Sequence, residues 1–311
     1  MRVLKKTIGI IGPGEHFKKK IYPVLKKSNF FKVSGILRIK KKKFKRVINL
    51  DEKNFFKKNF DFIYISCPNQ FHEKYIIKSL SSGSNVICEK PCLLNKKKLN
   101  KIINLSKKKK KLIFEAFMYL YHPAFKYVKN IIKNNKFGKL RYLVSNFRFP
   151  SLNKQNNRYF KKQGNGFFYD CASYLLSLEN ELFGNFYNKN KFYYTQKIKK
   201  TVDLKGNIFI RSSKINRFYF WGEGQNYSNN IELFFDSAAV FIDKFFSKKN
   251  NEDISIRIFK NYKINEISIK KVNHFSRMFS NIKKNYENIL FQEYHRKKIM
   301  SQSNNLLKYK N

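Results

Sequence analysis

A short glycine-containing motif near the N-terminus is the first place where this chain could bind a nucleotide. The motif GPGEHF (residues 12–17) follows the apolar run TIGII and precedes a segment of helical composition. In such a turn the first glycine permits tight bending, the second lets the backbone approach a pyrophosphate, and the helix N-terminus faces the anion. Phe17 replaces the third glycine of GxGxxG, so helix–strand packing must be looser or reshaped. The candidate cofactor-binding residues of this motif are Gly12, Gly14, Glu15 and His16.

The end of the next apolar run bears on the choice of cofactor. NAD-selective sites carry Asp or Glu there, about twenty residues after the glycines, to bind the ribose hydroxyls. This chain has Arg38 instead, followed by the basic run Lys40–Lys43. Arg38 could pair with a 2′-phosphate, which favours NADP and leaves NAD as the alternative. It could equally be one of the many basic residues of this chain.

Strand-like and helical segments alternate in the first part of the chain, as a nucleotide-binding turn requires. The apolar, β-rich runs are residues 7–11, 32–37, 61–66, 85–88 and 112–116. The helical segments between them are residues 15–27, 71–81 and 95–108. This alternation predicts an α/β Rossmann domain with a doubly wound parallel sheet over residues 1–116.

The pattern changes in the second part, where strand-like runs follow one another with few helices. The runs are residues 139–149, 190–199, 206–213, 216–222, 230–235 and 238–242, and the helical segments are 123–134, 168–183 and 274–300. We expect an α+β domain over residues 117–311, with an open antiparallel sheet and a C-terminal helix. Residues 218–221 place aromatic side chains on both faces, so the face away from the helices is expected to meet a second subunit. A homo-oligomer follows.

Composition limits the partners and the compartment. The 67 Lys and Arg residues against 20 Asp and Glu residues give a net charge of +47. Because the excess is mostly Lys, spread along the chain with the other residues of A/T-rich codons, base bias can produce it, while the charge also permits a nucleic-acid-binding protein that no motif supports. We expect weak polyanion binding but no specific nucleic-acid partner. With no run of about 18 apolar residues, no signal peptide and four cysteines, the expectation is a cytoplasmic protein without a membrane partner. No metal site is expected at Cys88 and Cys92, which lack a second ligand pair.

Further motifs appear in a fixed order along the chain. They are PNQFH (68–72), EKP (89–91), EAFMYLYHP (115–123), NRY (157–159), GNGFFYDCASY (164–174) and VNHF (272–275). Together with GPGEHF they resemble the Gfo/Idh/MocA oxidoreductase family over nearly the whole chain. The last of these segments are similar to the glucose–fructose oxidoreductase and dihydrodiol dehydrogenase branch, which carries tyrosine at position 174 where other branches carry histidine.

The resemblance implies an NAD(P)-dependent oxidoreductase acting on CH–OH groups, with hydride transfer between nicotinamide and a sugar, nucleotide sugar or polyol. Its implied catalytic residues are Lys90, Asp170 and Tyr174. Tyr174 would donate or accept the proton, but a phenol with an ordinary pKa near 10 does so efficiently at neutral pH only if a nearby ammonium lowers that pKa. In the family Lys90 is the candidate for this ammonium. Alternatively, Lys90 itself moves the proton. Asp170 precedes Tyr174 by one helical turn and would hold a substrate hydroxyl or orient the lysine. Further implied cofactor-binding residues are Pro68, Asn69, His72, Glu89 and Lys90.

Several departures from the family pattern leave other functions open. Leu120 stands where the branch often has Arg, Asn165 replaces the middle glycine of a GGG run, and the residues after Asp170 lack the usual glycine. One alternative is a catalytically weakened member kept as a binding or regulatory protein. Another uses bound nicotinamide for a transient oxidation during glycoside cleavage.

Overall fold

The computed structural model describes residues 4–38, 47–160, 166–184, 191–199, 202–224, 226–250 and 252–308. Its contacts divide the chain into two compact units, Met1–Ala116 with Met278–Asn311, and Phe117–Arg277. The first division falls at the expected position. Residues Met278–Asn311 belong to the first unit, whereas the C-terminal helix was expected in the second domain.

The first unit contains a sheet of six described strands in the order β3-β2-β1-β4-β5-β6, in which every neighbouring pair is parallel. The strands are β1 (Lys6–Ile11), β2 (Phe31–Leu37), β3 (Asn49–Leu50), β4 (Phe62–Ile65), β5 (Asn85–Cys88) and β6 (Ile113–Glu115). The helices are α1 (Tyr22–Lys26), α2 (Glu52–Lys57), α3 (His72–Ser81), α4 (Lys96–Lys109), α8 (Ile289–Lys308) and, from Met278 on, α7 (His274–Asn285). The order reverses beside β1, so the predicted doubly wound Rossmann sheet is confirmed.

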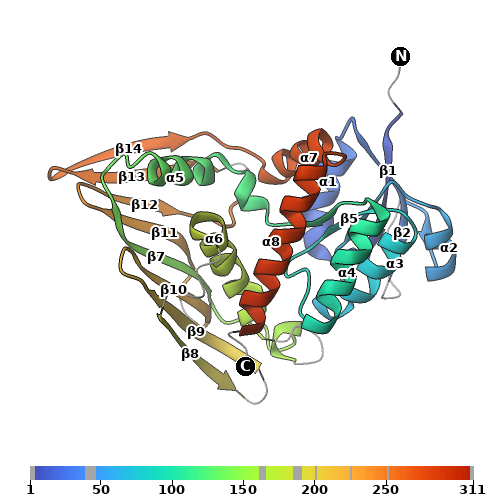
Figure 1. The fold of residues 1–311 in the computed structure, drawn as a ribbon, viewed down its shortest axis with the longest axis horizontal. Helices are drawn as coiled ribbons and strands as arrows, with labels where there is room; N and C mark the ends of the chain where they lie inside the picture. Colours follow the sequence, from blue (N-terminus) through green and yellow to red (C-terminus); the bar gives the residue numbers. More distant parts are fainter. Residues whose placement is uncertain are drawn as a thin grey trace. The chain divides into compact units, whose positions relative to one another are not determined.

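Helices cover both faces of this sheet (Figure 1). On one face α2, α3 and α4 pack on a core that includes Ile63 and Ile65 of β4. The alternate residues of β4 point to the other face, because side chains of a strand alternate. There Phe279 of α7 lies with its ring centroid 6.0 Å from that of Tyr64, and Tyr286 lies 5.0 Å from Phe62.

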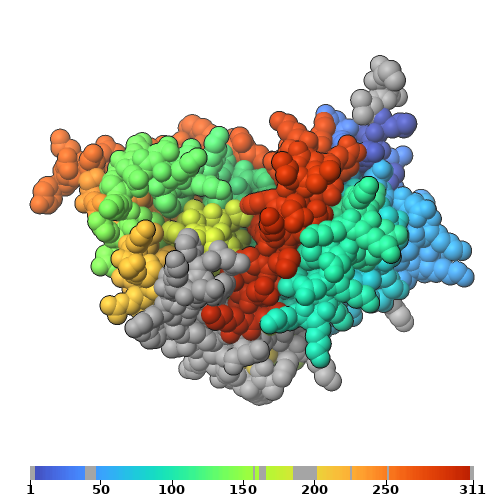
Figure 2. Space-filling view, in the orientation of Figure 1, coloured from blue at the N-terminus to red at the C-terminus, as the bar shows by residue number. Residues whose placement is uncertain are grey.

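The C-terminal helices belong to the first unit because their aromatic side chains complete this second face. The ring of His295 in α8 lies 4.4 Å from that of Phe114 in β6. Arg296 Nη1 also donates a hydrogen bond of 3.4 Å to Ser106 Oγ of α4. Figure 2 shows the red C-terminal helix alongside the blue-green α4 at the surface. None of the described helices is long and apolar enough to cross a membrane.

The second unit is built on a sheet of eight described strands in the order β14-β13-β12-β11-β7-β10-β9-β8. The strands are β7 (Leu140–Phe149), β8 (Lys191–Lys199), β9 (Val202–Arg211), β10 (Asn216–Glu223), β11 (Ser228–Phe235), β12 (Ala239–Asp243), β13 (Ile254–Lys260) and β14 (Lys263–Ile269). All neighbours are antiparallel except β7 and β10, which run parallel. The expected α+β domain with an open sheet is confirmed, and one parallel pair makes the sheet mixed.

Two helices, α5 (Pro123–Lys133) and α6 (Ser173–Phe183), lie on one side of this sheet (Figure 1). Tyr219 and Trp221 of β10 are fully buried under that side. Phe218 and Phe220 point to the other face and are only partly covered. The aromatic residues of β10 therefore lie on both faces of the sheet, as expected, and those on the face without helices are partly exposed.

Candidate functional site

The glycine motif forms a sharp turn between β1 and the first helix. Gly12 has a φ of +65°, and a Cβ atom there would lie 2.5 Å from the Cβ of Cys67. Only glycine fits such a position. A Cβ atom at Gly14 would meet nothing within 4 Å, so this backbone has the open space that the approach of a pyrophosphate requires. Glu15 and His16 follow as exposed residues at the helix start.

The helix start is reshaped around Phe17, as the missing third glycine predicted. Residues Phe17–Ile21 form a π-helical turn before α1, where the sequence predicted one helix over residues 15–27. The Phe17 side chain is fully buried, and its ring lies 6.1 Å from Tyr22 and 6.0 Å from Tyr64. The wider turn gives the ring room between helix and sheet.

Arg38 follows the last residue of β2 and lies close to the glycine turn. The Gly12 N–H donates a hydrogen bond of 2.8 Å to the carbonyl oxygen of Leu37, which brings this strand end to the turn. Nη2 of Arg38 is buried and has no hydrogen-bond partner among the described residues. A buried guanidinium nitrogen without an acceptor is a costly arrangement, and a phosphate oxygen would satisfy it. The basic run Lys40–Lys43 lies outside the described residues.

Two loops follow β4 and β5 at the same edge of the sheet. Pro68 and Asn69, both half-buried, begin the first of them. In the second, Glu89 accepts a hydrogen bond from the Tyr64 hydroxyl and lies 3.6 Å from Nε2 of His16. Lys90 comes next, half-buried, with a cis peptide bond to the following proline. The glycine turn and both loops thus meet at the carboxyl ends of the strands, where open α/β sheets bind their ligands.

His72 has a different position from the one expected of a cofactor-binding residue. It is 2% exposed, its Nδ1 lies 2.9 Å from the carbonyl oxygen of Pro91, and its Nε2 lies 2.8 Å from that of Cys67. Burial lowers its pKa. The side chain therefore connects the loop after β4 to the loop after β5.

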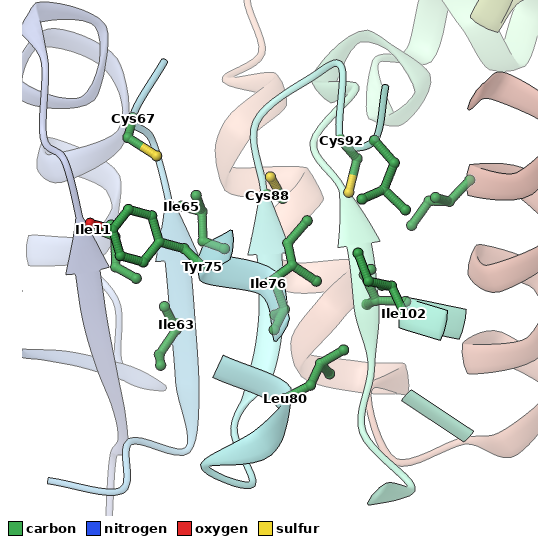
Figure 3. Close-up of a cluster of buried hydrophobic side chains, with 14 of the residues drawn as sticks. Ile11, Ile63, Ile65, Cys67, Tyr75, Ile76, Leu80, Cys88, Cys92 and Ile102 are labelled. Atoms are coloured by element: carbon green, nitrogen blue, oxygen red, sulfur yellow. The ribbon is translucent and has the colours of Figure 1, made fainter. Parts of the chain in front are cut away.

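The cysteines near this edge are buried thiols. Figure 3 shows Cys67, Cys88 and Cys92 among the aliphatic side chains of the core. Burial raises the pKa of Cys67 to about 12 and raises the pKa of the hydrogen-bonded Cys88 and Cys92 thiols as well. Such thiols are poor nucleophiles. Among the described residues, no group of three or more His, Cys, Asp or Glu side chains is placed to hold a metal ion.

In the second unit, Asp170 and Tyr174 lie at the start of the helical segment that ends with α6. Residues Phe168–Ala172 form a π-helical turn, and α6 continues from Ser173. The Tyr174 ring stacks on Phe147 with a centroid distance of 4.8 Å and an interplanar angle of 2°. Its hydroxyl donates to Sδ of Met118 at 3.7 Å. Stacking and burial fix the orientation of this phenol.

Arg158 holds Asp170 in place. This arginine belongs to the NRY motif, but no role was expected for it from the sequence. Nε and Nη2 of Arg158 each lie 2.7 Å from Oδ2 of Asp170. Nη1 of the same guanidinium donates to Oδ1 of Asn156 at 3.3 Å. The charge of Asp170 raises the pKa of Arg158, so the two form a charge-assisted pair beside the Tyr174 turn.

Asp203 of β9 is a supporting residue that sequence reasoning missed. Its Oδ2 accepts hydrogen bonds from the backbone N–H groups of Phe167 (2.8 Å) and Phe168 (2.5 Å), and so caps this helical segment from another strand. Gly166 has a φ of +86°, and a Cβ atom there would lie 2.2 Å from Oδ1 of Asp203. The glycine is needed for this contact, and no local pattern indicates an acid so far along the chain. Asn165 lies outside the described residues.

The candidate residues thus form two groups, one in each unit. The group in the first unit is a nucleotide-binding edge, and that in the second is a tyrosine and a carboxylate on one helix start. A Rossmann sheet with this edge is typical of enzymes that bind a dinucleotide.

Comparison with known proteins identifies the family. Residues 6–117 match the family model described as "Oxidoreductase family, NAD-binding Rossmann fold", and residues 125–213 match the "GFO/IDH/MocA C-terminal domain". The chain belongs to the Gfo/Idh/MocA oxidoreductase family. The resemblance seen in the motifs is confirmed.

Similar proteins act on sugars and related alcohols. The dTDP-3,4-didehydro-2,6-dideoxy-alpha-D-glucose 3-reductase of Saccharopolyspora spinosa is 22% identical over 68% of this chain and 64% of its own length. The trans-1,2-dihydrobenzene-1,2-diol dehydrogenase of Xenopus laevis is 24% identical over 30% of this chain and 28% of its own. Matches to three such 3-reductases thus span 56 to 64% of those relatives.

Solved structures extend the similarity of fold to almost the whole chain. A 3-ketoreductase from Actinomadura kijaniata, in complex with NADP and TDP-benzene, has a TM-score of 0.89 at 17% identity, over 97% of this chain and 96% of that one. The aldose-aldose oxidoreductase of Caulobacter crescentus has a TM-score of 0.81 at 14% identity, over 99% of both chains.

Proposed function

We propose that this protein is an NADP-dependent oxidoreductase that transfers a hydride between nicotinamide and a hydroxyl or keto group of a sugar, nucleotide sugar or polyol. The observation that carries the proposal is the joint presence of Lys90 after β5 and the Asp170–Tyr174 pair at the start of α6, in a chain of this family. The sugar and nucleotide-sugar substrates of its relatives support the substrate class.

The residues of the first unit fit a dinucleotide. The open space at Gly14 suits a pyrophosphate, and the buried Nη2 of Arg38 suits a 2′-phosphate. Pro68 and Asn69 are proposed to line the nicotinamide side, and Glu89, which accepts a hydrogen bond from Tyr64, is proposed to contact the cofactor from the loop after β5. When bound, the cofactor supplies or accepts the hydride. The complex of the Actinomadura kijaniata ketoreductase with NADP supports this choice of cofactor.

The proton that accompanies the hydride is proposed to move through Tyr174 and Lys90. Transfer at carbon requires a proton to enter or leave the attached oxygen. The Tyr174 hydroxyl can donate or accept that proton, and the Lys90 ammonium either stabilises the phenolate or moves the proton itself. Asp170 would hold a substrate hydroxyl or orient the lysine, while Arg158 fixes its Oδ2. NADPH oxidation with a panel of keto sugars and nucleotide sugars tests the proposal, and no turnover with any of them would contradict it.

Arg38→Ala should weaken NADPH binding about tenfold to a hundredfold, because a charged hydrogen bond to the phosphate is lost. NADH affinity should not change, since NADH lacks that phosphate. Fluorescence titration of both cofactors in high salt measures this, with Lys32→Ala, an exposed cation on the same strand, as the control. Equal losses for both cofactors, or a wild-type preference for NADH, would remove Arg38 as the selector.

The altered glycine motif does not by itself favour a weakened, non-catalytic member. The π-helical turn accommodates Phe17 while Gly12 and Gly14 keep the backbone features that a pyrophosphate needs. The same titration separates the two functions, since a chain that binds neither NADPH nor NADH cannot be a dehydrogenase.

We propose that the open face of the second-unit sheet joins two copies of the chain. Phe209 and Phe218 stack on it with a centroid distance of 4.5 Å. Phe241 lies 5.7 Å from Phe234 and 5.2 Å from Phe259 on neighbouring strands. Partly exposed aromatic residues in one face are typical of subunit interfaces.

Phe218→Glu combined with Phe241→Glu should convert the oligomer into a monomer, because charges would be buried in the contact. Light scattering after size exclusion gives the mass of each species. Tyr262→Glu, at the exposed turn between β13 and β14, should leave the mass unchanged. A wild-type chain that is already monomeric at micromolar concentration would refute the interface.

A cytoplasmic location is also proposed, because all four cysteines are free thiols.

A further inference from the structure

A buried carboxyl group lies behind the loop that carries Lys90. Glu115, the last residue of β6, is 2% exposed and pairs with Cys88 across the β5–β6 ladder. Its Oε1 accepts a hydrogen bond of 2.8 Å from the backbone N–H of Cys92, two residues after Lys90. Its Oε2 is buried and has no hydrogen-bond partner among the described residues. A buried acid with one oxygen left unsatisfied is costly for stability alone, which points to a functional reason.

Charged and titratable groups from each neighbouring element surround this carboxyl group. Burial raises the pKa of Glu115 to about 7, against the opposing effects of the Cys92 N–H and of the charges on Lys298 and Lys90. Lys298 comes from α8, as does His295, whose pKa burial and Lys298 lower well below its usual value. The thiols of Cys88 and Cys92 also interact with the charge of Glu115, which helps to raise their pKa.

We propose that Glu115 is a positioning residue for Lys90, because its buried carboxyl group anchors the lysine's loop at the Cys92 N–H and acts electrostatically on the ammonium. This inference rests on the proposed function, in which Lys90 takes part in proton transfer. The C-terminal helix has a part in it, because Lys298 is the other cation that acts on Glu115.

The two roles of the carboxyl group separate with pH. Below about pH 7 Glu115 is protonated and neutral, and only the hydrogen bond to the Cys92 N–H acts on the loop. Above about pH 7 it carries a negative charge, which the charges of Lys298 and Lys90 favour. We therefore expect the lysine's environment to change near neutral pH, which is where such an enzyme works.

The charge coupling can be measured without any substrate. In the full chain with ¹³C-labelled glutamate, one carboxyl resonance should titrate with a midpoint near 7 and be absent in Glu115→Gln. Lys90→Met and Lys298→Met should each raise this midpoint by about half a unit or more, since a neighbouring cation that favoured the carboxylate is removed. Lys108→Met, an exposed lysine of α4, should leave it unchanged. If the titration midpoint of Glu115 is the same in Lys90→Met as in the wild type, the proposal is overturned.

Two substitutions then separate the charge from the anchor. Glu115→Gln keeps an oxygen for the Cys92 N–H but cannot ionise, so its kcat should match the wild type at pH 6 and fall about tenfold below it at pH 8.5. Glu115→Asp keeps the charge but is too short for the same hydrogen bond, so its kcat should be lower at both pH values with the pH dependence preserved. A parallel pH profile for wild type and Glu115→Gln would refute the charge role. If no variant, wild type included, turns over any sugar, the proposed function fails, and the substrate-free titration still decides the coupling.

Discussion

Lys90→Met and Tyr174→Phe are each expected to lower turnover by about 10²–10⁴-fold, the range that a positioned proton-transfer group contributes. Both substitutions keep most of the side-chain volume and remove the group that carries the proton or the charge. Phenylalanine at position 174 can still stack on Phe147, so the packing around α6 should be preserved. NADPH affinity should remain largely intact, because the hydroxyl and the ammonium act on the reacting oxygen.

Steady-state kinetics with the best substrate, together with NADPH titration, measures these effects. Tyr127→Phe is the matched control for the tyrosine, because the Tyr127 hydroxyl is buried without a hydrogen-bond partner among the described residues. Lys101→Met on the exposed side of α4 is the control for the lysine. If Lys90→Met and Tyr174→Phe both retain full activity, the assignment of the proton-transfer pair is wrong. If they lose cofactor binding as well, the two residues act on the cofactor.

The first unit could be predicted from the sequence because its signals are local. Each buried strand is a short apolar run, and the strand after residue 84 was predicted with its observed bounds, Asn85–Cys88. Gly12 was identified because a tight turn needs a positive φ, which the structure shows. The effect of Phe17 was also foreseen in kind, because a large ring cannot occupy the place of a glycine without changing the helix.

What the sequence missed depends on contacts between distant residues. β14 is exposed over most of its length, so it has no hydrophobic alternation, and the β13–β14 turn uses Asn261 and Tyr262 at positive φ in place of the usual glycine. The C-terminal helices were expected in the second domain, because contacts such as the packing of Phe279 on Phe31, at 5.6 Å, cannot be read from the sequence. The role of His72 could not be decided from the sequence for the same reason, since a motif does not reveal burial.

The second large effect is expected at Arg158. Arg158→Met should lower kcat by about tenfold to a hundredfold, because Asp170 loses two N–H donors at 2.7 Å and its carboxylate can rotate away from the productive position. Arg158→Lys should recover part of the rate, since it restores the charge without the two-pronged geometry. KM for the substrate should rise less than kcat falls if the pair acts mainly in the transition state.

A double-mutant cycle with Asp170→Asn distinguishes positioning from simple stabilisation. If Arg158 acts through Asp170, the double variant should be little worse than Asp170→Asn alone, because residues that act as a unit are strongly non-additive. Arg257→Met is the matched control, since it breaks an exposed Arg–Asp pair of 3.0 Å between β12 and β13 of the same unit, and exposed pairs contribute little to stability. Additive losses would mean that Arg158 contacts the substrate itself. In that case the arginine, and not the carboxylate it holds, would be the second anchor of the site beside Tyr174.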